Sequence, residues 1–318
     1  MMLLAMRHRA AQCALLLLLA ALSLSEKSFH RRSPHNAKYN FNLLTERNPD
    51  LKPFVKTSRS GDDSSTIDFS NSKGVLELNR ALLSTFYNVT DWHLGEDSLL
   101  PPVPSRADYV YHILDLLPAV SEREYITGLD IGTGASCIYP LIATSLSLNS
   151  RNIRMVGSEV NAISFNVAQK NAFQRGEAIE IRKQDNSDCI FDSIIQQNDF
   201  YDFSMCNPPF YKSAKDQVAA SDRKNKNLKI PVGNSNFRGM SHELYCNGGE
   251  LKFIDRMIKE SVRFKSQVGL FTSLISSNEH IPLIARCLEK LDEDVKYDFV
   301  EMNTGNKQTR FVTWTYTL

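Results

Sequence analysis

The sequence lacks the clustered cysteines and histidines that a structural zinc site requires. No two cysteines form a C-x-x-C pair, and no histidine spacing completes a zinc pattern. The six cysteines are Cys13, Cys137, Cys189, Cys206, Cys246 and Cys287. Separated cysteines in a chain of 318 residues are typical of reduced, buried thiols rather than of a disulfide framework. We therefore expect neither a bound metal nor a disulfide scaffold.

The chain also lacks an excess of charge of either sign. It has 37 lysines and arginines against 36 acidic residues, a formal net charge of +1. A protein that coats nucleic acid through its bulk charge is thereby excluded, so a nucleic-acid partner must be held by local basic patches. A hydrophobic fraction of 42% with 23% charged residues is ordinary for a globular protein and excludes a disordered or fibrous one.

No hydrophobic run is long enough to span a bilayer. The longest, residues 13–25, follows Arg7 and Arg9 and has the length of a signal-peptide core. A secretory signal, an organelle transit peptide and an extension outside the folded domain remain alternative interpretations. We leave residues 1–25 out of the fold.

The rest of the chain changes its pattern near residue 125. Residues 26–65 are polar and turn-rich, and helical spacing of apolar residues follows at 75–87 and 107–117. Strands and helices then alternate, with a long loop or insert at 211–248. Strands are expected at 125–132, 153–159, 178–183, 201–206, 267–274, 295–302 and 310–318, and helices at 136–148, 160–173, 250–264 and 280–291. This alternation predicts a Rossmann-like α/β domain with a seven-stranded, mostly parallel sheet and one antiparallel strand near the end.

A glycine turn lies where the first strand of this domain meets its first helix. The motif is Asp130-Ile131-Gly132-Thr133-Gly134. Glycine suits a turn with positive φ whose backbone a ligand approaches closely, although an ordinary strand-to-helix turn is the alternative. The second strand ends at Glu159, where an acid can accept hydrogen bonds from ribose hydroxyls or can stabilise the start of a helix. Without a third glycine or another pyrophosphate signature, the pair favours S-adenosylmethionine over NAD.

The fourth strand ends in the turn Asn207-Pro208-Pro209-Phe210. Prolines cannot donate backbone hydrogen bonds, so they end the strand, and in an open α/β sheet this end faces the cofactor turn. The Asn207 side-chain carbonyl and a proline carbonyl can each accept one N–H of an exocyclic amine, and Phe210 can stack on the base. The alternatives are a simple strand-terminating turn and a protein-glutamine methyltransferase, although the latter usually has tyrosine in the fourth position.

Basic residues follow this turn. Residues 211–230 carry a local charge of +4, which suits contacts to RNA phosphates, with a solvated loop as the alternative. The candidate RNA-binding residues are Lys212, Arg223, Lys224 and Lys226. A second basic stripe, Lys252, Arg256, Lys259 and Arg263, is better explained as a solvated helix face. In the N-terminal region, His35, Tyr39 and Phe41 could stack on bases or pack in the core.

With these motifs together, the chain resembles the RNA adenine N6-methyltransferases. That family includes bacterial large-subunit ribosomal RNA enzymes and the eukaryotic U6 spliceosomal RNA enzyme of the methyltransferase-like 16 type. The resemblance covers residues 33–318. It leans toward the ribosomal branch through the TIDF and LNRALL strings, the Asp-Arg-Lys-x-x-Asn-Leu segment and the Asn-Phe-x-Gly loop, whereas the eukaryotic enzyme additionally carries C-terminal RNA-binding repeats, which are not expected here. It is carried by the strings HNAKYNF, TIDF, LNRALL, PPVPSRADYVYH, LDIGTGASCIYPLI, GSE, NPPF, SDRKNKNL, ELYCNGGELKF and KQTRFVTW.

The resemblance implies a class I S-adenosylmethionine-dependent fold and a role for several positions. Arg106 corresponds to a contact with the cofactor carboxylate, and Asp185 lies near the position that reads the cofactor adenine. Residues 26–118 would cover the cofactor and grip RNA, and residues 119–318 would form the methyltransferase core. Methyl transfer to the N6 amine of an adenosine in structured RNA is the expected activity, with large-subunit ribosomal RNA favoured over U6 RNA. Its rivals are DNA-adenine and protein-glutamine methyltransferases, and a non-catalytic RNA-binding module.

The same resemblance shapes the expected setting of the protein. We expect a monomer whose folded part makes no stable membrane association. The cytoplasm or the nucleus is the expected compartment, with a mitochondrion or plastid as the alternative that residues 1–25 leave open. A secretory compartment would separate an RNA enzyme from both its substrate and its cofactor.

Overall fold

A mixed β-sheet forms the centre of the protein. The computed structural model describes residues 28–58, 64–95, 98–119, 123–209, 248–291, 294–304 and 307–317. The strands of the sheet are β3 (Tyr125–Ile131), β4 (Ser147–Leu148), β5 (Arg151–Glu159), β6 (Ile179–Lys183), β7 (Tyr201–Cys206), β8 (Val268–Ile275), β9 (Val295–Thr304) and β10 (Lys307–Tyr316). Their order is β6-β5-β3-β7-β8-β10-β9, with β4 also paired to β5.

The predicted sheet is confirmed. Strands β6, β5, β3, β7 and β8 pair in parallel, while β10 runs antiparallel to both β8 and β9. The two-residue strand β4, which pairs antiparallel with the start of β5, was not predicted. Because β3, β5, β6, β7 and β8 run in the same direction, their carboxyl ends all lie at the same edge of the sheet.

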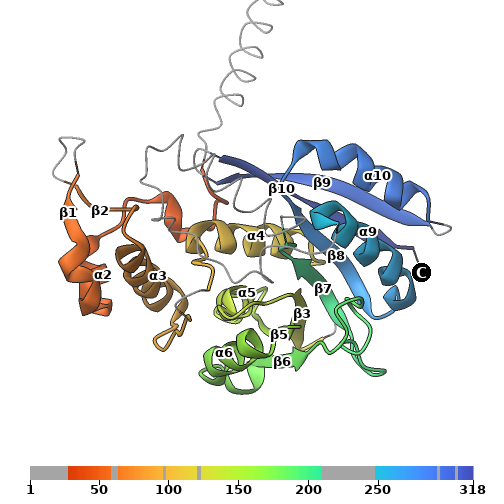
Figure 1. Ribbon diagram of the computed structural model, residues 1–318, viewed down its shortest axis with the longest axis horizontal. Coiled ribbons are helices and arrows are strands. Elements are labelled where there is room, and N and C mark those ends of the chain that lie inside the picture. The colour runs from red at the N-terminus through yellow and green to blue at the C-terminus, as the bar shows by residue number, and fades with distance from the viewer. Residues whose placement is uncertain are drawn as a thin grey trace, which may run out of the picture.

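Helices cover both faces of the sheet (Figure 1). The helices α4 (Val103–Leu116), α5 (Ile138–Ala143) and α6 (Ala162–Phe173) share one hydrophobic cluster with Ile126, Phe203 and Phe311. On the other face, α9 (Gly249–Ser261) and α10 (Ile281–Glu289) pack with Leu129 and Trp314. Alternate residues of β3 and β10 thus enter opposite cores, as strand geometry requires.

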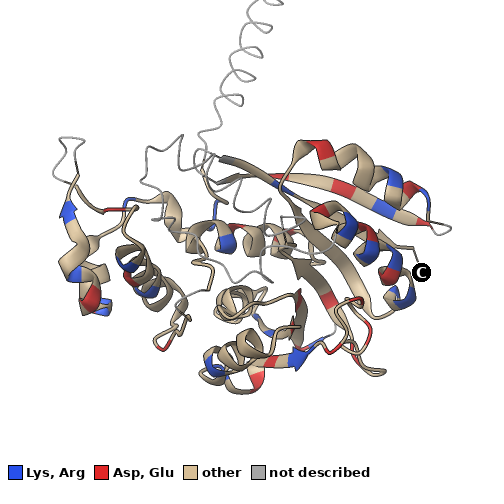
Figure 2. Cartoon of the chain, viewed as in Figure 1, with Lys and Arg blue, Asp and Glu red and all other residues tan. Residues whose placement is uncertain are grey.

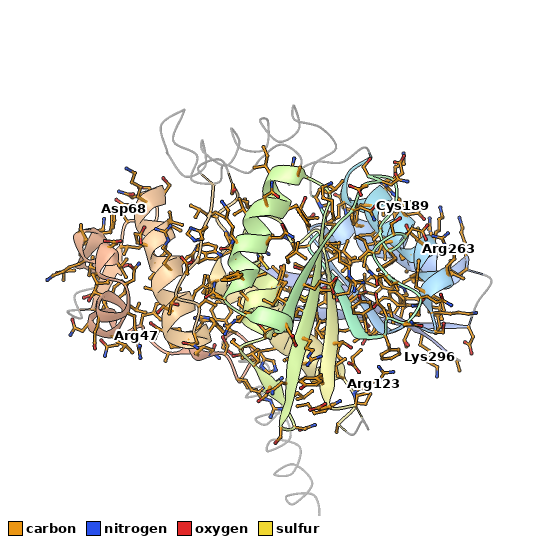
Figure 3. All side chains as sticks on the ribbon, turned by 90° about the horizontal axis from the view of Figure 1, so that it is seen from below. Arg47, Asp68, Arg123, Cys189, Arg263 and Lys296 are labelled. Carbon is orange, nitrogen blue, oxygen red and sulfur yellow. The ribbon has the colours of Figure 1, made fainter. Side chains whose placement is uncertain are left out.

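The N-terminal elements extend the first of these cores. They are η1 (Pro34–Asn36), α2 (Phe41–Arg47), η2 (Pro49–Phe54), the antiparallel pair β1 (Val55–Thr57) and β2 (Ser65–Ile67), and α3 (Ser72–Tyr87). Short 3-10 turns also occur at η3 (Gly176–Ala178), η4 (Val262–Phe264) and η5 (Asn278–His280). In Figure 3, Arg47 and Asp68 mark the end of the molecule formed by these N-terminal elements, and Arg263 and Lys296 lie toward the opposite end.

His35 and Tyr39 take the core-packing alternative. The His35 ring is buried and makes hydrogen bonds with the hydroxyls of Tyr87 (2.8 Å) and Tyr39 (3.0 Å). Burial lowers the pKa of His35 to about 4, so the ring is neutral at neutral pH. Phe41 also packs against the hydrophobic cluster. These side chains therefore stabilise the N-terminal elements.

The prediction for the first helix after β3 was wrong. We expected a helix over residues 136–148 whose regular part follows Pro140, but α5 has only six residues, Ile138–Ala143. Pro140 lies in its first turn, where a backbone N–H has no partner within the helix, so proline is tolerated there. A tight turn at Asn149 and Ser150, both with positive φ, then joins β4 to β5.

The sequence run at residues 13–25 lies outside the described residues. Within the described part of the chain, no helix combines the length and the apolar character needed to cross a membrane.

Candidate active site

A cavity opens at the carboxyl ends of β3, β5 and β7. Its lining includes six residues that the sequence singled out, Arg106, Gly132, Gly134, Glu159, Asn207 and Pro209. Ile131 of β3 pairs with Cys206 of β7, so the glycine turn and the Asn-Pro-Pro turn leave neighbouring strands at the same level. The two motifs, some 75 residues apart in the chain, therefore meet in one cavity, as the alternating strands and helices predicted.

The glycine turn presents bare backbone to this cavity. Gly132 and Gly134 have φ values of +71° and +64°, in the left-handed region that favours glycine. A Cβ atom on Gly132 would meet no other atom within 4 Å, so the φ angle, and not crowding, is what requires glycine there. The N–H of Thr133 donates to the carbonyl of Ser158 (2.9 Å), which fixes the turn against the end of β5.

Glu159, the last residue of β5, connects the end of this strand to the glycine turn that follows β3. Its carboxylate accepts hydrogen bonds from the backbone N–H of Gly134 (2.9 Å) and of Asn161 (2.8 Å). The N-cap of α6 is Asn161, whose side chain accepts from Ile163 and Ser164. Glu159 is therefore not the helix cap, and its position in the cavity lining places carboxylate oxygens where hydroxyl donors can reach them.

Asp130 lies beneath the glycine turn and is fully buried. Neither carboxylate oxygen forms a hydrogen bond of normal geometry with a described residue. Burial raises its pKa to about 7, and the charge of Glu159 adds to this effect, whereas Thr133 and Arg106 oppose it. The site thus contains a buried acid whose charge is incompletely balanced by the described residues.

Arg106 comes from the first turns of α4 and lines the same cavity. Its guanidinium carbon lies 5.7 Å from the centre of the Tyr139 ring. Tyr139, on α5, is buried, and burial raises its pKa further above the ordinary value. The arrangement places a positive charge in the cavity wall.

Asn207 has an unsatisfied acceptor. Its Oδ1 atom is buried and has no hydrogen-bond partner among the described residues, although the residue lines the cavity. Buried carbonyl oxygens are rarely left without a donor unless a ligand or water supplies one. Pro209 lies beside it in the lining, and Phe210 lies outside the described residues. The turn therefore offers the cavity an acceptor that no described residue satisfies.

Hydrogen bonds from residues that sequence patterns did not indicate fix the backbone directly after the glycine turn. The Trp92 indole N–H donates to the Ser136 carbonyl (2.9 Å), and the Asn171 amide donates to the Ala135 carbonyl (2.8 Å). Asn171 also exchanges hydrogen bonds with the backbone of His93 (2.8 Å each). These contacts join segments 36 to 78 residues apart, so no local motif could have shown them.

Other lining residues were also missed, among them Tyr139, Val160 and Phe253. Tyr139 stands inside the GASCIYPLI string, and Val160 directly follows Glu159, so their positions beside known motifs were a usable signal. Phe253 reaches the cavity from α9, across the sheet edge, and only the fold reveals it.

Asp185, the remaining predicted cofactor contact, does not line the cavity. Asp185 follows β6, its side chain is 88% exposed, and it pairs with Lys183 (3.3 Å) outside the lining. Lys212, Arg223, Lys224 and Lys226 lie outside the described residues. On α9, acids alternate with the basic stripe (Figure 2), and Lys259 pairs with Asp255 (2.7 Å), which agrees with a solvated helix face.

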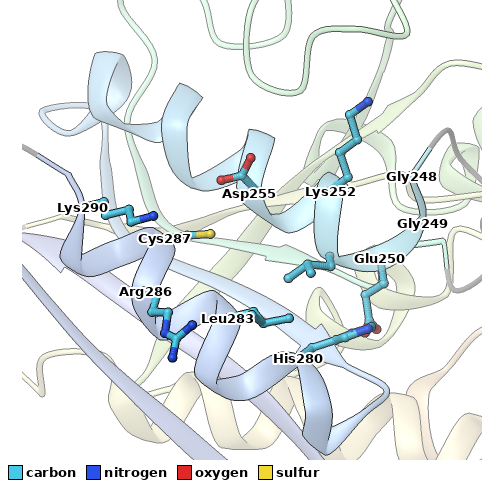
Figure 4. A pocket seen from close by; sticks show the side chains of 11 residues that line it. Gly248, Gly249, Glu250, Lys252, Asp255, His280, Leu283, Arg286, Cys287 and Lys290 are labelled. Atoms are coloured by element: carbon cyan, nitrogen blue, oxygen red, sulfur yellow. The ribbon is translucent and has the colours of Figure 1, made fainter.

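A larger hollow lies between α9 and α10 (Figure 4). Its lining includes Lys252, Asp255, Cys287 and the hydrogen-bonded pair of Glu250 and His280. None of the predicted cofactor or catalytic residues contributes to it. Within the described residues, no group of three or more side chains could hold a metal ion. The smaller cavity at the strand ends is therefore the candidate active site.

A family model with the description RNA methyltransferase matches residues 23–317 of the chain. The chain belongs to this RNA methyltransferase family. It is similar to the ribosomal RNA large subunit methyltransferase F of Christiangramia forsetii, with 43% identity over 291 residues, 90% of this chain and 99% of that protein. The protein of the same name from Escherichia coli strain K12 / DH10B is 40% identical over 301 residues, 93% of this chain and 96% of that protein.

The fold of this RNA methyltransferase is shared with solved structures. The hMettl16 catalytic domain, solved in complex with MAT2A 3'UTR hairpin 1, is 27% identical with a TM-score of 0.76, covering 91% of this chain and 96% of that one. The same catalytic domain in complex with hairpin 6 is 26% identical with a TM-score of 0.75, covering 92% and 98%. The resemblance to RNA methyltransferases is thus confirmed over the N-terminal elements as well as the sheet.

Proposed function

We propose that this RNA methyltransferase transfers a methyl group from S-adenosylmethionine to the N6 amine of an adenosine in large-subunit ribosomal RNA. The observation that carries the proposal is the single cavity in which the unsatisfied Asn207 oxygen and the glycine turn meet. The names of the curated relatives support ribosomal RNA as the substrate class, and the hairpins bound to the solved relative support structured RNA as the partner.

The donor set fits S-adenosylmethionine. Gly132 leaves backbone uncovered, Glu159 offers carboxylate oxygens to ribose hydroxyls, and Arg106 offers a guanidinium to a carboxylate. The incompletely balanced charge of Asp130 favours a ligand that carries positive charge, as the ammonium and sulfonium groups of this cofactor do. Once bound, the cofactor supplies an electrophilic methyl group on sulfur. Asp185 stays a predicted contact to the cofactor adenine.

Asn207 orients the nucleophile. Adenine's exocyclic nitrogen is conjugated with the ring and therefore reacts poorly. When Asn207 Oδ1 and a proline carbonyl of the turn each accept one N–H, the nitrogen is held with its lone pair directed toward the methyl group. Alignment of this kind can contribute about 7–11 kcal/mol to lowering a barrier. We assign Phe210 to stacking on the base, and Pro208 and Pro209 to fixing the turn.

Substrate binding is assigned to the basic residues after this turn. Lys212, Arg223, Lys224 and Lys226 would contact phosphates, and residues 26–118 would cover the cofactor and contribute to the RNA surface. We propose that the protein acts as a monomer in a compartment that contains ribosomal RNA, with the cytoplasm favoured by its bacterial relatives.

A transfer assay tests the proposal against its rivals. Tritium from methyl-labelled S-adenosylmethionine should enter total RNA, and should not enter DNA or protein, when each is incubated separately with the protein. Label in DNA or on protein glutamine would refute the substrate class. Failure to bind the cofactor at all would leave a non-catalytic RNA-binding module.

A further inference from the structure

Arg310 is a buried cation that has no partner among the described residues. The residue is only 7% exposed, yet its guanidinium makes no hydrogen bond or ion pair with any described residue, and its Nε atom is fully enclosed. Leaving an unpaired charge buried is costly, so proteins normally pair such groups or use them to bind a ligand. The position therefore calls for an anion that none of the described residues supplies.

The register of the sheet places Arg310 at the catalytic edge. It pairs with Ile275, the last residue of β8, and β8 lies beside β7, which leads into Asn207. Arg310 thus lies two strands away from the Asn-Pro-Pro turn, a spacing of about 10 Å for neighbouring strands about 4.8 Å apart. Figure 1 shows β10 next to β8 in this part of the sheet.

The acids near Arg310 are engaged elsewhere. Glu301, opposite it on β9, accepts a hydrogen bond from the Gln308 amide (2.7 Å). Glu250, in the first turn of α9, accepts a hydrogen bond from the N–H of Ser276 (2.7 Å), which directly follows β8, and is also hydrogen-bonded to His280. Neither carboxylate forms an ion pair with Arg310, so the guanidinium keeps its charge available to an incoming group.

We propose that Arg310 binds a backbone phosphate of the RNA substrate next to the target adenosine. The inference rests on the proposed function, because it assumes that RNA enters at the edge that holds Asn207. A guanidinium presents its donors in a planar fork that matches two phosphate oxygens, and such charge-assisted bonds are strong where water is excluded. The cofactor carboxylate is the less suitable anion, since Arg106 lines the cofactor cavity and Arg310 does not.

The test compares three variants of the full chain with the wild type. Arg310→Met removes the charge but keeps an unbranched side chain, and Arg310→Lys keeps the charge but not the fork. Arg154→Met is the matched control, because Arg154 is exposed and stacks on Tyr125 (3.7 Å to the ring centre) near the opposite ends of the strands. The probe is protein-free large-subunit ribosomal RNA, with affinity measured over a series of salt concentrations.

Arg310→Met should weaken RNA binding by about 10- to 100-fold, the range for losing a hydrogen bond to a charged group. The slope of log affinity against log salt should become shallower by about 0.7–0.9, which corresponds to one phosphate contact. S-adenosylmethionine affinity should stay unchanged, and the melting temperature should not fall, because a buried unpaired charge has been removed. Arg310→Lys should keep the salt slope with weaker binding, and Arg154→Met should match the wild type.

Two results would overturn the assignment. If Arg310→Met binds RNA with the wild-type affinity and salt slope, Arg310 contacts no phosphate. If the variant instead loses thermal stability in parallel with RNA binding, its role is structural. A wild-type protein that neither binds nor methylates this RNA would refute the proposed function itself, and with it the role of Arg310, whatever the variants do.

Discussion

Replacing Asp130 with asparagine should stabilise the protein without ligand, and increasingly so as the pH rises. The carboxylate is fully buried without a hydrogen bond from a described residue, and burial raises its pKa from an ordinary value of 3.8 to about 7. The folded protein therefore holds a proton that the unfolded chain releases between pH 4 and pH 7. Over this window the free energy of unfolding falls as the pH rises, and above pH 7 the loss is complete.

The size of the effect follows from this shift. Each pKa unit corresponds to about 1.4 kcal/mol, so a shift of about three units costs the wild type roughly 4 kcal/mol of stability above pH 7. At pH 5 the cost is about 1.6 kcal/mol, because only the part of the window between pH 4 and pH 5 has been crossed. The free energy of unfolding of Asp130→Asn, relative to that of the wild type, should therefore rise by about 2–3 kcal/mol between pH 5 and pH 8.

Urea unfolding of the wild type and Asp130→Asn at pH 5, 6, 7 and 8 measures this difference. Isothermal titration at pH 8 should show that Asp130→Asn binds S-adenosylmethionine more weakly than the wild type does, since the negative charge that attracts the cofactor is gone. The substitution therefore stabilises the fold but weakens cofactor binding. A stability difference that does not change with pH would refute the raised pKa. Unchanged cofactor affinity would remove Asp130 from the cofactor site.

Three further predictions follow from the same contacts. Asn207→Ala should abolish methyl transfer while leaving S-adenosylmethionine affinity within about two-fold of the wild type; transfer at the wild-type rate in a single-turnover assay would contradict the orienting role. Trp92→Phe removes the hydrogen bond to the Ser136 carbonyl, worth about 1 kcal/mol, and should raise the cofactor dissociation constant roughly five-fold in isothermal titration. An unchanged constant would mean that this hydrogen bond does not help to position the glycine turn. The wild type should lose about 3 kcal/mol of stability as the pH falls from 6.5 to 4, because His35 takes up a proton in the unfolded chain but stays neutral when it is buried in the folded protein. Urea unfolding of His35→Gln should not show this loss. An equal loss of stability in both proteins would mean that other groups cause the acid sensitivity.

Local patterns were sufficient to predict the elements that position the site. The alternation of strands and helices predicted which strand ends share an edge, and the motifs at 130–134 and 207–209 lie at two of those ends. The contacts that hold the cavity in shape could not be predicted in this way. Trp92 and Asn171 reach the glycine turn from distant segments, and their partners are backbone carbonyls, which carry no sequence signal.

The errors also have physical causes. Pro140 was treated as a barrier to a helix start, although the first turn of a helix tolerates proline because its N–H groups lack helical partners. Asp185, which the family resemblance placed near the cofactor adenine, has an exposed side chain beside Lys183 outside the cavity lining, and its role stays a prediction. For Arg310, the KQTRFVTW string showed an arginine on a strand, and only the fold shows that its guanidinium is buried without a partner among the described residues.

The central claim is that one cavity brings an adenine amine to an activated methyl group. The most direct test is to map methylated adenosines in large-subunit ribosomal RNA and U6 RNA after incubation with S-adenosylmethionine, with the wild type and with no protein added. We predict one new N6-methyladenosine in the large-subunit RNA that requires the wild-type protein. A methyl group on another base or on a ribose, or no new methylation in either RNA, would contradict the account.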